Sequence, residues 1–193
     1  MYFFTADLHL GHANIIKFQQ RPYDNVDQMD RCLIDNWNKV VSPGDTVWIL
    51  GDFSFNDQQR YLSQLNGTKC LVLGNHDINK HRGKFNQINE FKRLFNYVCE
   101  YTELTIDKQF IVLSHYPFLA WNKSHHRSWQ LFGHVHGALI DIPGLLHYDV
   151  GVDCNNYTPV SFNQIKSIMS KKKFDPFVQL VPTSQRTENL ARS

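Results

Sequence analysis

Histidine, aspartate and asparagine stand in five short motifs along this 193-residue chain, and side chains of these types bind metal ions. In order, the motifs are Asp7-Leu8-His9, Gly51-Asp52, Gly74-Asn75-His76-Asp77, Ser114-His115 and Gly133-His134-Val135-His136. Four of them lie where a predicted strand gives way to a loop, which is where open α/β sheets place their ligand sites. Carboxylate, amide and imidazole groups together suit Mn, Fe, Zn or Ni better than Ca or Mg alone.

The number and spacing of these residues indicate more than one ion. Residues one apart on an extended backbone, as in the first and last motifs, point to the same side and can converge. Seven candidate ligands exceed the three or four of a typical single zinc site, whereas two ions that share a bridging carboxylate would use them all. The seven are Asp7, His9, Asp52, Asn75, His115, His134 and His136. We therefore expect two divalent transition-metal ions. Manganese is the metal we favour, with Fe, Zn or Ni as alternatives.

Taken singly, each residue has an ordinary structural explanation. The two aspartates could cap helices or form turns, Asn75 could form a turn, and His9 and His115 could be hydrogen-bonded core residues. The ordered occurrence of all five motifs favours the metal site over these alternatives.

Apolar and amphipathic segments alternate along the chain, which predicts an α/β fold. Strands are expected at 2–6, 46–50, 69–73, 101–106, 109–113 and 146–152, and helices at 26–40, 57–65 and 161–169. Asn25 is the expected cap of the helix at 26–40, and Ser161 with Gln164 forms a capping box for the helix at 161–169. Asp107-Lys108 is expected to join two strands as a hairpin. We expect one domain over 1–181 and a polar tail over 182–193.

Composition excludes several classes of protein. Lys and Arg number 20 against 18 Asp and Glu, so a net charge of +2 does not indicate binding to nucleic acid or to a membrane by bulk charge. No apolar run approaches the ~18 residues of a membrane span. The first seven residues lack a basic region and include Asp7, so no signal peptide is expected. These features predict a cytoplasmic protein.

The five ordered motifs resemble those of the calcineurin-like metallophosphoesterase superfamily, over about residues 1–165. The resemblance implies a four-layer α/β/β/α sandwich, in which two mixed sheets are flanked by helices, and hydrolysis of phosphate esters by a metal-activated hydroxide. It assigns Asp7, His9, Asp52 and His136 to one ion, and Asp52, Asn75, His115 and His134 to the other. Asp52 would bridge the two ions. His76 matches the catalytic histidine of the family, and Asp77 matches the acid that orients it.

The second motif departs from that of the protein serine/threonine phosphatases, which reads Gly-Asp-x-Val-Asp-Arg-Gly. Here residues 51–56 lack the arginine, which argues against a phosphoprotein substrate. The stretches 11–16 and 21–23 further resemble a compact bacterial and phage branch of these enzymes.

Two residues outside the ligand set are candidate substrate contacts. His12 lies three residues from His9, and Arg21 could bind two phosphate oxygens at once; a buried imidazole and a surface ion pair are the alternatives. Aromatic and basic residues between Tyr116 and Arg127 could wall a pocket and stack a base.

We expect a small phosphodiester or nucleotide as substrate. A nuclease or nucleic-acid end phosphatase is one alternative. A scaffold without activity, like the metallophosphoesterase-like subunit of retromer, is another. His76 favours an enzyme, because a scaffold has no need of a group that protonates a leaving oxygen.

Overall fold

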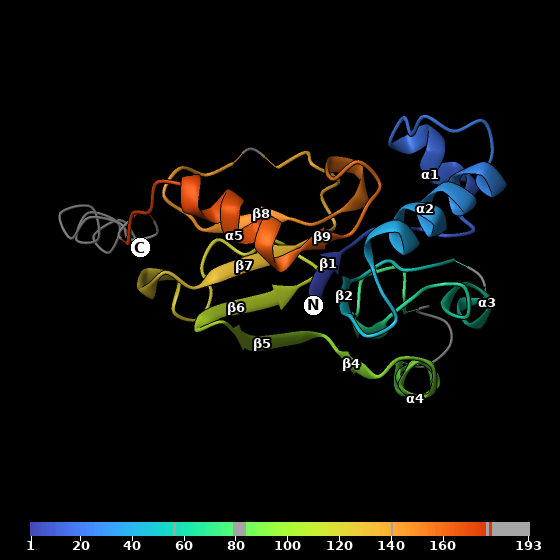
Figure 1. The fold of residues 1–193 in the computed structure, drawn as a ribbon, viewed down its shortest axis with the longest axis horizontal. Coiled ribbons are helices and arrows are strands. Elements are labelled where there is room, and N and C mark those ends of the chain that lie inside the picture. The colour runs from blue at the N-terminus through green and yellow to red at the C-terminus, as the bar shows by residue number, and fades with distance from the viewer. Residues whose placement is uncertain (56, 79–83, 140, 177, 179–193) are drawn as a thin grey trace, which may run out of the picture.

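Two mixed β-sheets form the centre of the fold in this computed structural model, which describes residues 1–55, 57–78, 84–139, 141–176 and 178 (Figure 1). The first sheet has the strand order β4-β3-β2-β1-β9, and the second has the order β5-β6-β7-β8. The strands of the first sheet are β1 (Tyr2–Thr5), β2 (Thr46–Leu50), β3 (Thr68–Val72), β4 (Tyr97–Cys99) and β9 (Val160–Ser161). Those of the second are β5 (Tyr101–Ile106), β6 (Gln109–Ser114), β7 (Trp129–Phe132) and β8 (His147–Asp149).

Parallel pairing dominates both sheets. In the first, β1 to β4 are parallel, with Tyr2 opposite Thr46, and only β9 is antiparallel to its neighbour β1. In the second, β6, β7 and β8 are parallel, and β5 forms an antiparallel hairpin with β6. The carboxyl ends of β1, β2 and β3 therefore meet at one edge of the first sheet, and those of β6 and β7 meet in the second.

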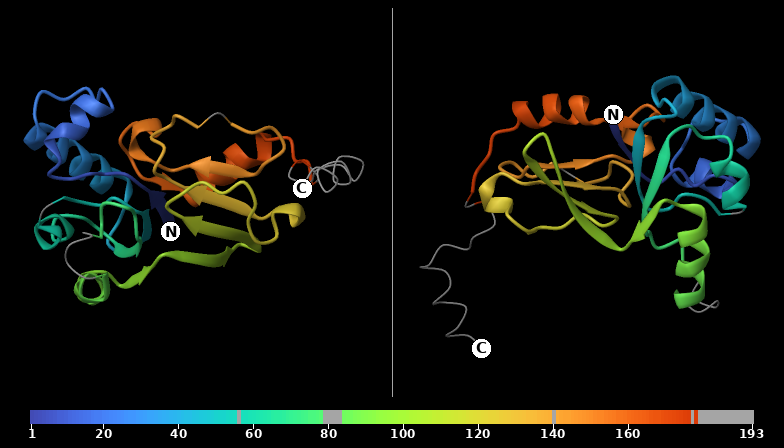
Figure 2. Two further views of the ribbon diagram at one scale, coloured as in Figure 1. Left: turned by 180° about the vertical axis from the view of Figure 1, so that it is seen from behind. Right: turned by 60° about the horizontal axis from the view of Figure 1, so that its bottom comes forward.

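Helices flank the sheets. They are α1 (Ala13–Phe18), α2 (Val26–Val40), α3 (Gln58–Leu62), α4 (Lys84–Leu94) and α5 (Phe162–Lys171), with 3-10 turns η1 (Ser124–His126) and η2 (Val152–Cys154). Figures 1 and 2 show α1 to α4 gathered on the side of the first sheet, and α5 over the other half of the molecule. Within the described ranges, no helix has both the length and the apolar character that a membrane crossing requires.

Successive side chains of each strand point to opposite faces of the sheet, and this divides the core into layers. Leu33 and Trp37 of α2 pack against the face of the first sheet that carries Ile49. Leu50, one residue further along β2, points to the opposite face and packs with Leu113 of the second sheet. Because successive strand residues face opposite sides, a single strand contributes to both layers.

The sandwich of two mixed sheets with flanking helices confirms the predicted fold class. The hairpin at Asp107-Lys108 is present, and both residues have positive φ, as tight hairpin turns require. Asn25 caps α2 and the capping box of Ser161 begins α5, as predicted. The strand expected at 146–152 is shorter, because Asp149 turns its carboxylate back to the backbone N–H of Gly151 at 2.8 Å. The predicted tail over 182–193 lies outside the described residues.

Candidate metal centre

The five motifs come together where the parallel strands end. Asp7 follows β1, Asp52 follows β2, and Asn75 follows β3. His115 follows β6 and His134 follows β7. Neighbouring loops are tied together within each sheet: in the first, the backbone N–H of Asp7 donates to the carbonyl oxygen of Gly51 (3.0 Å), and in the second, that of Gly133 donates to the carbonyl oxygen of His115 (2.9 Å).

The backbone at this place is strained. Five of the seven candidate ligands have positive φ, between 49° and 72°. They are Asp7, His9, Asp52, His134 and His136. Non-glycine residues rarely adopt this conformation, and when several do so together they mark a functional site, because the surrounding structure must hold them there at a cost.

Two buried carboxylates face each other at the centre. Asp7 is fully buried, and its Oδ2 accepts the backbone N–H of His134 at 2.8 Å. Asp52 is 3% exposed, and its Oδ1 accepts the backbone N–H of His76 at 2.9 Å. Burial, followed by repulsion from Asp52, raises the pKa of Asp7, and burial likewise raises the pKa of Asp52. A bound cation would relieve this repulsion.

Several buried polar atoms near these carboxylates have no hydrogen-bond partner. Oδ1 of Asp7 and both ring nitrogens of His9 are buried without one. Burial lowers the pKa of His9 to about 2, so the ring is neutral and carries a lone pair. Oδ2 of Asp52 lies 3.6 Å from Nε2 of His9 and 3.7 Å from Nε2 of His115. Unpartnered acceptors that converge in this way fit a divalent cation.

Two groups of ligand atoms are compact enough to hold an ion, with all atoms of each group within 4.8 Å of one another. One consists of Asp7, His9 and His136, and the other of Asp7, Asp52 and His115. Asp7 belongs to both groups, while Oδ2 of Asp52 lies between a histidine of each. Asp and His groups that could bind metal are therefore present where the sequence predicts them.

His115 and Asn75 form the side of the centre nearest the second sheet. Nδ1 of His115 lies 2.8 Å from the carbonyl oxygen of Leu50, which only accepts, so this nitrogen carries the proton. Nε2 then presents its lone pair 2.9 Å from Oδ1 of Asn75. The lone pairs of His115 Nε2 and Asn75 Oδ1 are thus arranged as two ligands of one cation would be. The ring of His134 lies 5.0 Å from that of His115.

Asp153 is a functional residue that the sequence analysis missed. Its Oδ2 lies 2.6 Å from Nδ1 of His136. Arg21 donates two hydrogen bonds of 2.8 Å, one to each oxygen of the Asp153 carboxylate. Burial alone would raise the pKa of Asp153, but the hydrogen bonds from His136 and Arg21 outweigh burial and hold it below its usual range. The contact leaves Nε2 of His136 free to face the centre. No motif marks Asp153 in the sequence; only its place in η2 brings it to His136.

The expectation that Arg21 binds a phosphate group of the substrate is wrong. Its side chain is buried, and besides Asp153 it donates to the carbonyl oxygens of Asp7 (2.7 Å) and Leu8 (2.9 Å) and to the sulfur of Met29. All five N–H groups of the guanidinium are thus used inside the protein. Arg21 holds the loop that carries the first motif.

Two motif glycines are required by close approach. A Cβ on Gly74 would lie 2.6 Å from the backbone nitrogen of Asp52 and closer still to its Oδ1. A Cβ on Gly133 would lie 2.5 Å from Oδ2 of Asp7. The absence of a side chain at both positions lets the loops press against the two carboxylates.

His76 and Asp77 have separate positions. The side chain of His76 is exposed at the rim, with its ring 5.5 Å from that of His9. Asp77 is buried, and its carboxylate accepts the backbone N–H groups of Asp52, Phe53 and Gly74. Among the described residues no hydrogen bond joins it to His76, so the expectation that it orients His76 is wrong. Asp77 instead fixes the loop that presents Asp52.

The remaining substrate candidates differ in their surroundings. The ring of His12 stacks on that of Phe55 with centroids 3.7 Å apart, and lies 5.5 Å from the ring of His9, so it borders the centre. Trp121 is buried and donates to Oγ of Ser128 at 2.9 Å, so it belongs to the core rather than to a pocket wall. Tyr116 lies at the centre, with its ring 4.5 Å from that of His134.

Comparisons with known proteins place the chain among relatives. No protein-family profile matches it. The uncharacterized protein MJ1445 of Methanocaldococcus jannaschii is 30% identical over 181 residues, which cover 89% of this chain and 92% of that protein. The gene 66 protein of Mycobacterium phage L5 is 29% identical over 164 residues, covering 71% and 78% of the two chains.

The chain is also similar to solved structures. The protein of unknown function AQ665 from Aquifex aeolicus matches with a TM-score of 0.67 at 26% identity, covering 87% of this chain and 98% of that chain. A weaker match is an archaeal phosphodiesterase, with a TM-score of 0.45 at 16% identity over 78% of this chain and 82% of that chain. A likeness at that level carries no argument about activity.

Proposed function

The chain belongs to the same protein family as MJ1445 of Methanocaldococcus jannaschii, and we propose that it is a phosphoesterase that depends on two divalent metal ions. The observation that carries this proposal is the convergence of buried, unpartnered ligand atoms from Asp7 and His9 on Asp52 at the ends of the parallel strands. The ordered motifs resemble those of the calcineurin-like metallophosphoesterases, and the site lies where such a fold would need it.

In this proposal two sets of residues hold the ions. As the resemblance implies, the first consists of Asp7, His9, Asp52 and His136, and the second of Asp52, Asn75, His115 and His134. In support, ligand atoms of Asp7, His9 and His136 lie close together, as do those of Asp7, Asp52 and His115. The hydrogen bonds of His115 to Leu50 and of His136 to Asp153 select tautomers that present Nε2 to the ions. When bound, the ions lower the pKa of water and neutralise charge on the phosphate oxygens, with manganese as the favoured metal.

His76 supplies the proton that the reaction needs. Its backbone N–H is anchored on Asp52, and its ring stands at the exposed rim of the centre near Phe55. From this position the imidazole can donate a proton to the oxygen of the leaving alcohol as the bond to phosphorus breaks. His12, stacked on Phe55, is positioned to contact the phosphate beside it.

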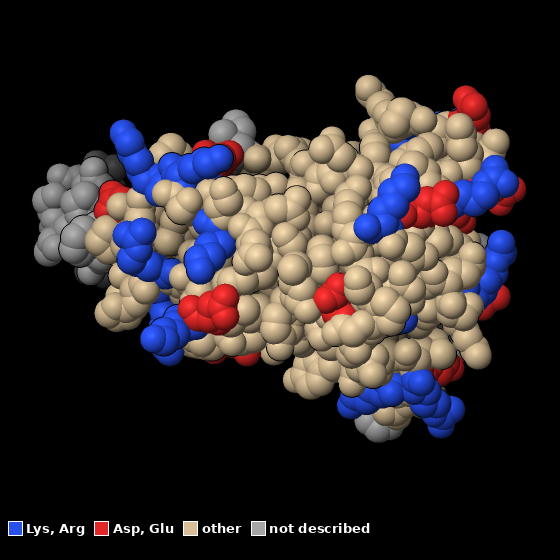
Figure 3. All heavy atoms as spheres, viewed as in Figure 1, with Lys and Arg blue, Asp and Glu red and all other residues tan. Residues whose placement is uncertain are grey.

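A small phosphodiester or nucleotide suits the charge of the molecule better than a polymer does. On the face shown in Figure 3, Lys and Arg lie in separate groups among acidic residues, and the net charge is +2. Binding a nucleic-acid backbone relies on many cationic contacts along one surface. A nuclease is therefore the second candidate function, and experiment must distinguish it from a phosphoesterase that acts on small substrates.

The test uses protein treated with a chelator and then supplied with Mn²⁺. We expect turnover of a chromogenic phosphodiester or monoester that depends on Mn²⁺ and is absent in Asp52→Asn. Faster cleavage of single-stranded oligonucleotides would favour a nuclease. If none of these compounds is hydrolysed, the proposal is wrong and a scaffold on the same fold takes its place.

A further inference from the structure

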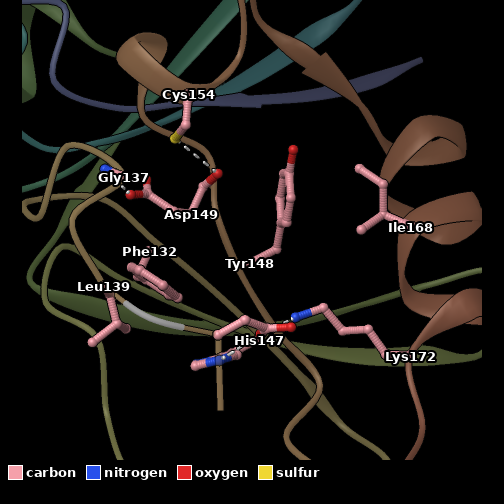
Figure 4. Close-up of a pocket in the computed structure, with 10 residues that line it drawn as sticks. Phe132, Gly137, Leu139, His147, Tyr148, Asp149, Cys154, Ile168 and Lys172 are labelled. Carbon is pink, nitrogen blue, oxygen red and sulfur yellow. Dashed lines mark hydrogen bonds and ion pairs between the residues drawn. The ribbon is translucent and has the colours of Figure 1, made fainter. Parts of the chain in front are cut away.

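A cavity of about 350 Å³ opens directly beside the candidate metal centre. Asn75 and His115, two of the predicted ligands, are also part of its lining. The remaining walls are mostly apolar, with Leu73, Ile78, Tyr116 and Phe118, and their polar members are Glu100 and Ser114. A second cavity, of about 370 Å³ between β8 and α5, contains none of the seven candidate ligands in its described lining (Figure 4). Of these two cavities in the described part of the chain, the first is the one that a group attached to a phosphate at the centre could enter.

Aromatic rings form one wall of this cavity. Tyr116 is 47% exposed, and its ring meets the rings of His134 and His115 edge to face, at 4.5 Å and 5.1 Å. These two contacts fix the ring of Tyr116 between the cavity and the centre. The ring of Phe118 lies beside that of Tyr101, with centroids 6.2 Å apart and an interplanar angle of 28°.

A buried glutamine holds the segment that carries both rings. Gln130 of β7 is fully buried, and its Oε1 accepts the backbone N–H of Phe118 at 3.0 Å. Its Nε2 donates to Oγ of Ser114 (2.9 Å) and to the carbonyl oxygen of Tyr116 (3.2 Å). Oγ of Ser114 donates to the same carbonyl oxygen at 2.8 Å. The backbone that carries the two rings is therefore fixed before any ligand binds, which lowers the entropic cost of binding.

We propose that this cavity binds a planar aromatic group of the substrate, such as the base of a nucleotide, while the phosphate lies at the metal centre. This inference rests on the proposed phosphoesterase function. The cavity has the volume of a small-ligand pocket, and its aliphatic and aromatic walls suit a flat ring.

The test compares two phosphate esters of similar size, one with a flat aromatic ring and one with a puckered saturated ring. Benzyl phosphate and cyclohexylmethyl phosphate, each also as its methyl diester, both release primary alcohols, and the part of the difference in kcat/KM that Tyr116→Leu removes measures ring recognition. With Mn²⁺ we expect the benzyl ester to be preferred by at least about fivefold, the lower end of base–aromatic stacking.

Variants assign that preference to the wall. Tyr116→Leu should bring the ratio of the two kcat/KM values close to one, whereas Tyr116→Phe should keep it. Tyr2→Leu is the matched control, because Tyr2 is 41% exposed but lies at the opposite end of β1 from the centre. Calorimetry on chelator-treated protein gives a second readout: adenosine 5′-monophosphate should bind at least about fivefold more tightly than ribose 5-phosphate.

The outcomes separate the two proposals. Hydrolysis of both esters at equal kcat/KM, or a benzyl preference that survives Tyr116→Leu, overturns the aromatic pocket and leaves the phosphoesterase in place. If the protein hydrolyses the chromogenic esters but neither of these two, the aromatic pocket is overturned and the phosphoesterase stays in place. If it hydrolyses none of them, the phosphoesterase is overturned, and the inference fails with it.

Discussion

Gly74→Ala tests whether the position of Asp52 controls the metal centre. A Cβ at this position would lie 2.6 Å from the backbone nitrogen of Asp52, 3.0 Å from its Cγ and closer still to its Oδ1. Asp52 cannot simply rotate away, because its Oδ1 accepts the N–H of His76 and its own N–H donates to Asp77. The loops after β2 and β3 must therefore move apart.

The size of the displacement sets the expected effect. Real Cβ contacts do not fall below 3.0 Å, so the nitrogen of Asp52 must retreat by about 0.4 Å, and its Oδ1 by more. Ligand distances in metal sites stay within about 0.2 Å of their usual values, so a shift of this size disrupts coordination. We expect metal affinity to fall by about 10- to 100-fold, the range for lost support of a ligand. Overpacking should cost about 1–3 kcal/mol, or about 2–12 °C in Tm.

The assay pairs Mn²⁺ titration calorimetry with thermal unfolding of the metal-free protein. Gly44→Ala is the control, since a Cβ there meets no atom within 4 Å, and we expect its stability to stay within about 0.5 kcal/mol of wild type. If Gly74→Ala binds Mn²⁺ as tightly as Gly44→Ala and unfolds at the same temperature, the contact with Asp52 does not constrain the centre and the reasoning is refuted.

Three further predictions follow from the site and its support. Asp153→Asn should weaken Mn²⁺ binding by about 10- to 100-fold in calorimetry, because it frees the ring of His136; unchanged affinity would contradict that role. His76→Ala should retain metal in elemental analysis while kcat falls by about 100-fold or more, whereas loss of metal would make it a ligand. Burial raises the pKa of Asp30, so the folded protein keeps this proton after the unfolded chain loses it near pH 3.9, and stability falls as pH rises through that window. The stability of Asp30→Asn relative to wild type in urea unfolding should therefore rise from pH 4 upward, and a difference that does not change with pH would contradict this.

Much of the fold and of the candidate site could be predicted because both follow local rules. Buried strands such as β2 are continuous apolar runs that end at a glycine or an acidic residue. Parallel strands end at a common edge, so Asp7, Asp52 and Asn75 had to approach one another once their strands were recognised. The helix caps at Asn25 and Ser161 depend on residues three positions apart, which a sequence shows directly.

The support of the site could not be predicted in the same way. Asp153 lies 17 residues from His136 in a 3-10 turn without a motif, so only the folded chain shows their contact. Arg21 carries a charge that suits phosphate equally well, and nothing in its neighbours in sequence shows that it is buried beneath the first motif. Asp77 follows His76 directly, yet the turn sends its carboxylate to the backbone of Asp52.

Diffraction from crystals grown with Mn²⁺, measured at the manganese absorption edge, tests the central claim most directly. The account predicts two anomalous peaks on either side of Oδ2 of Asp52, one toward His9 and the other toward His115. A single peak, or peaks away from these residues, would contradict it.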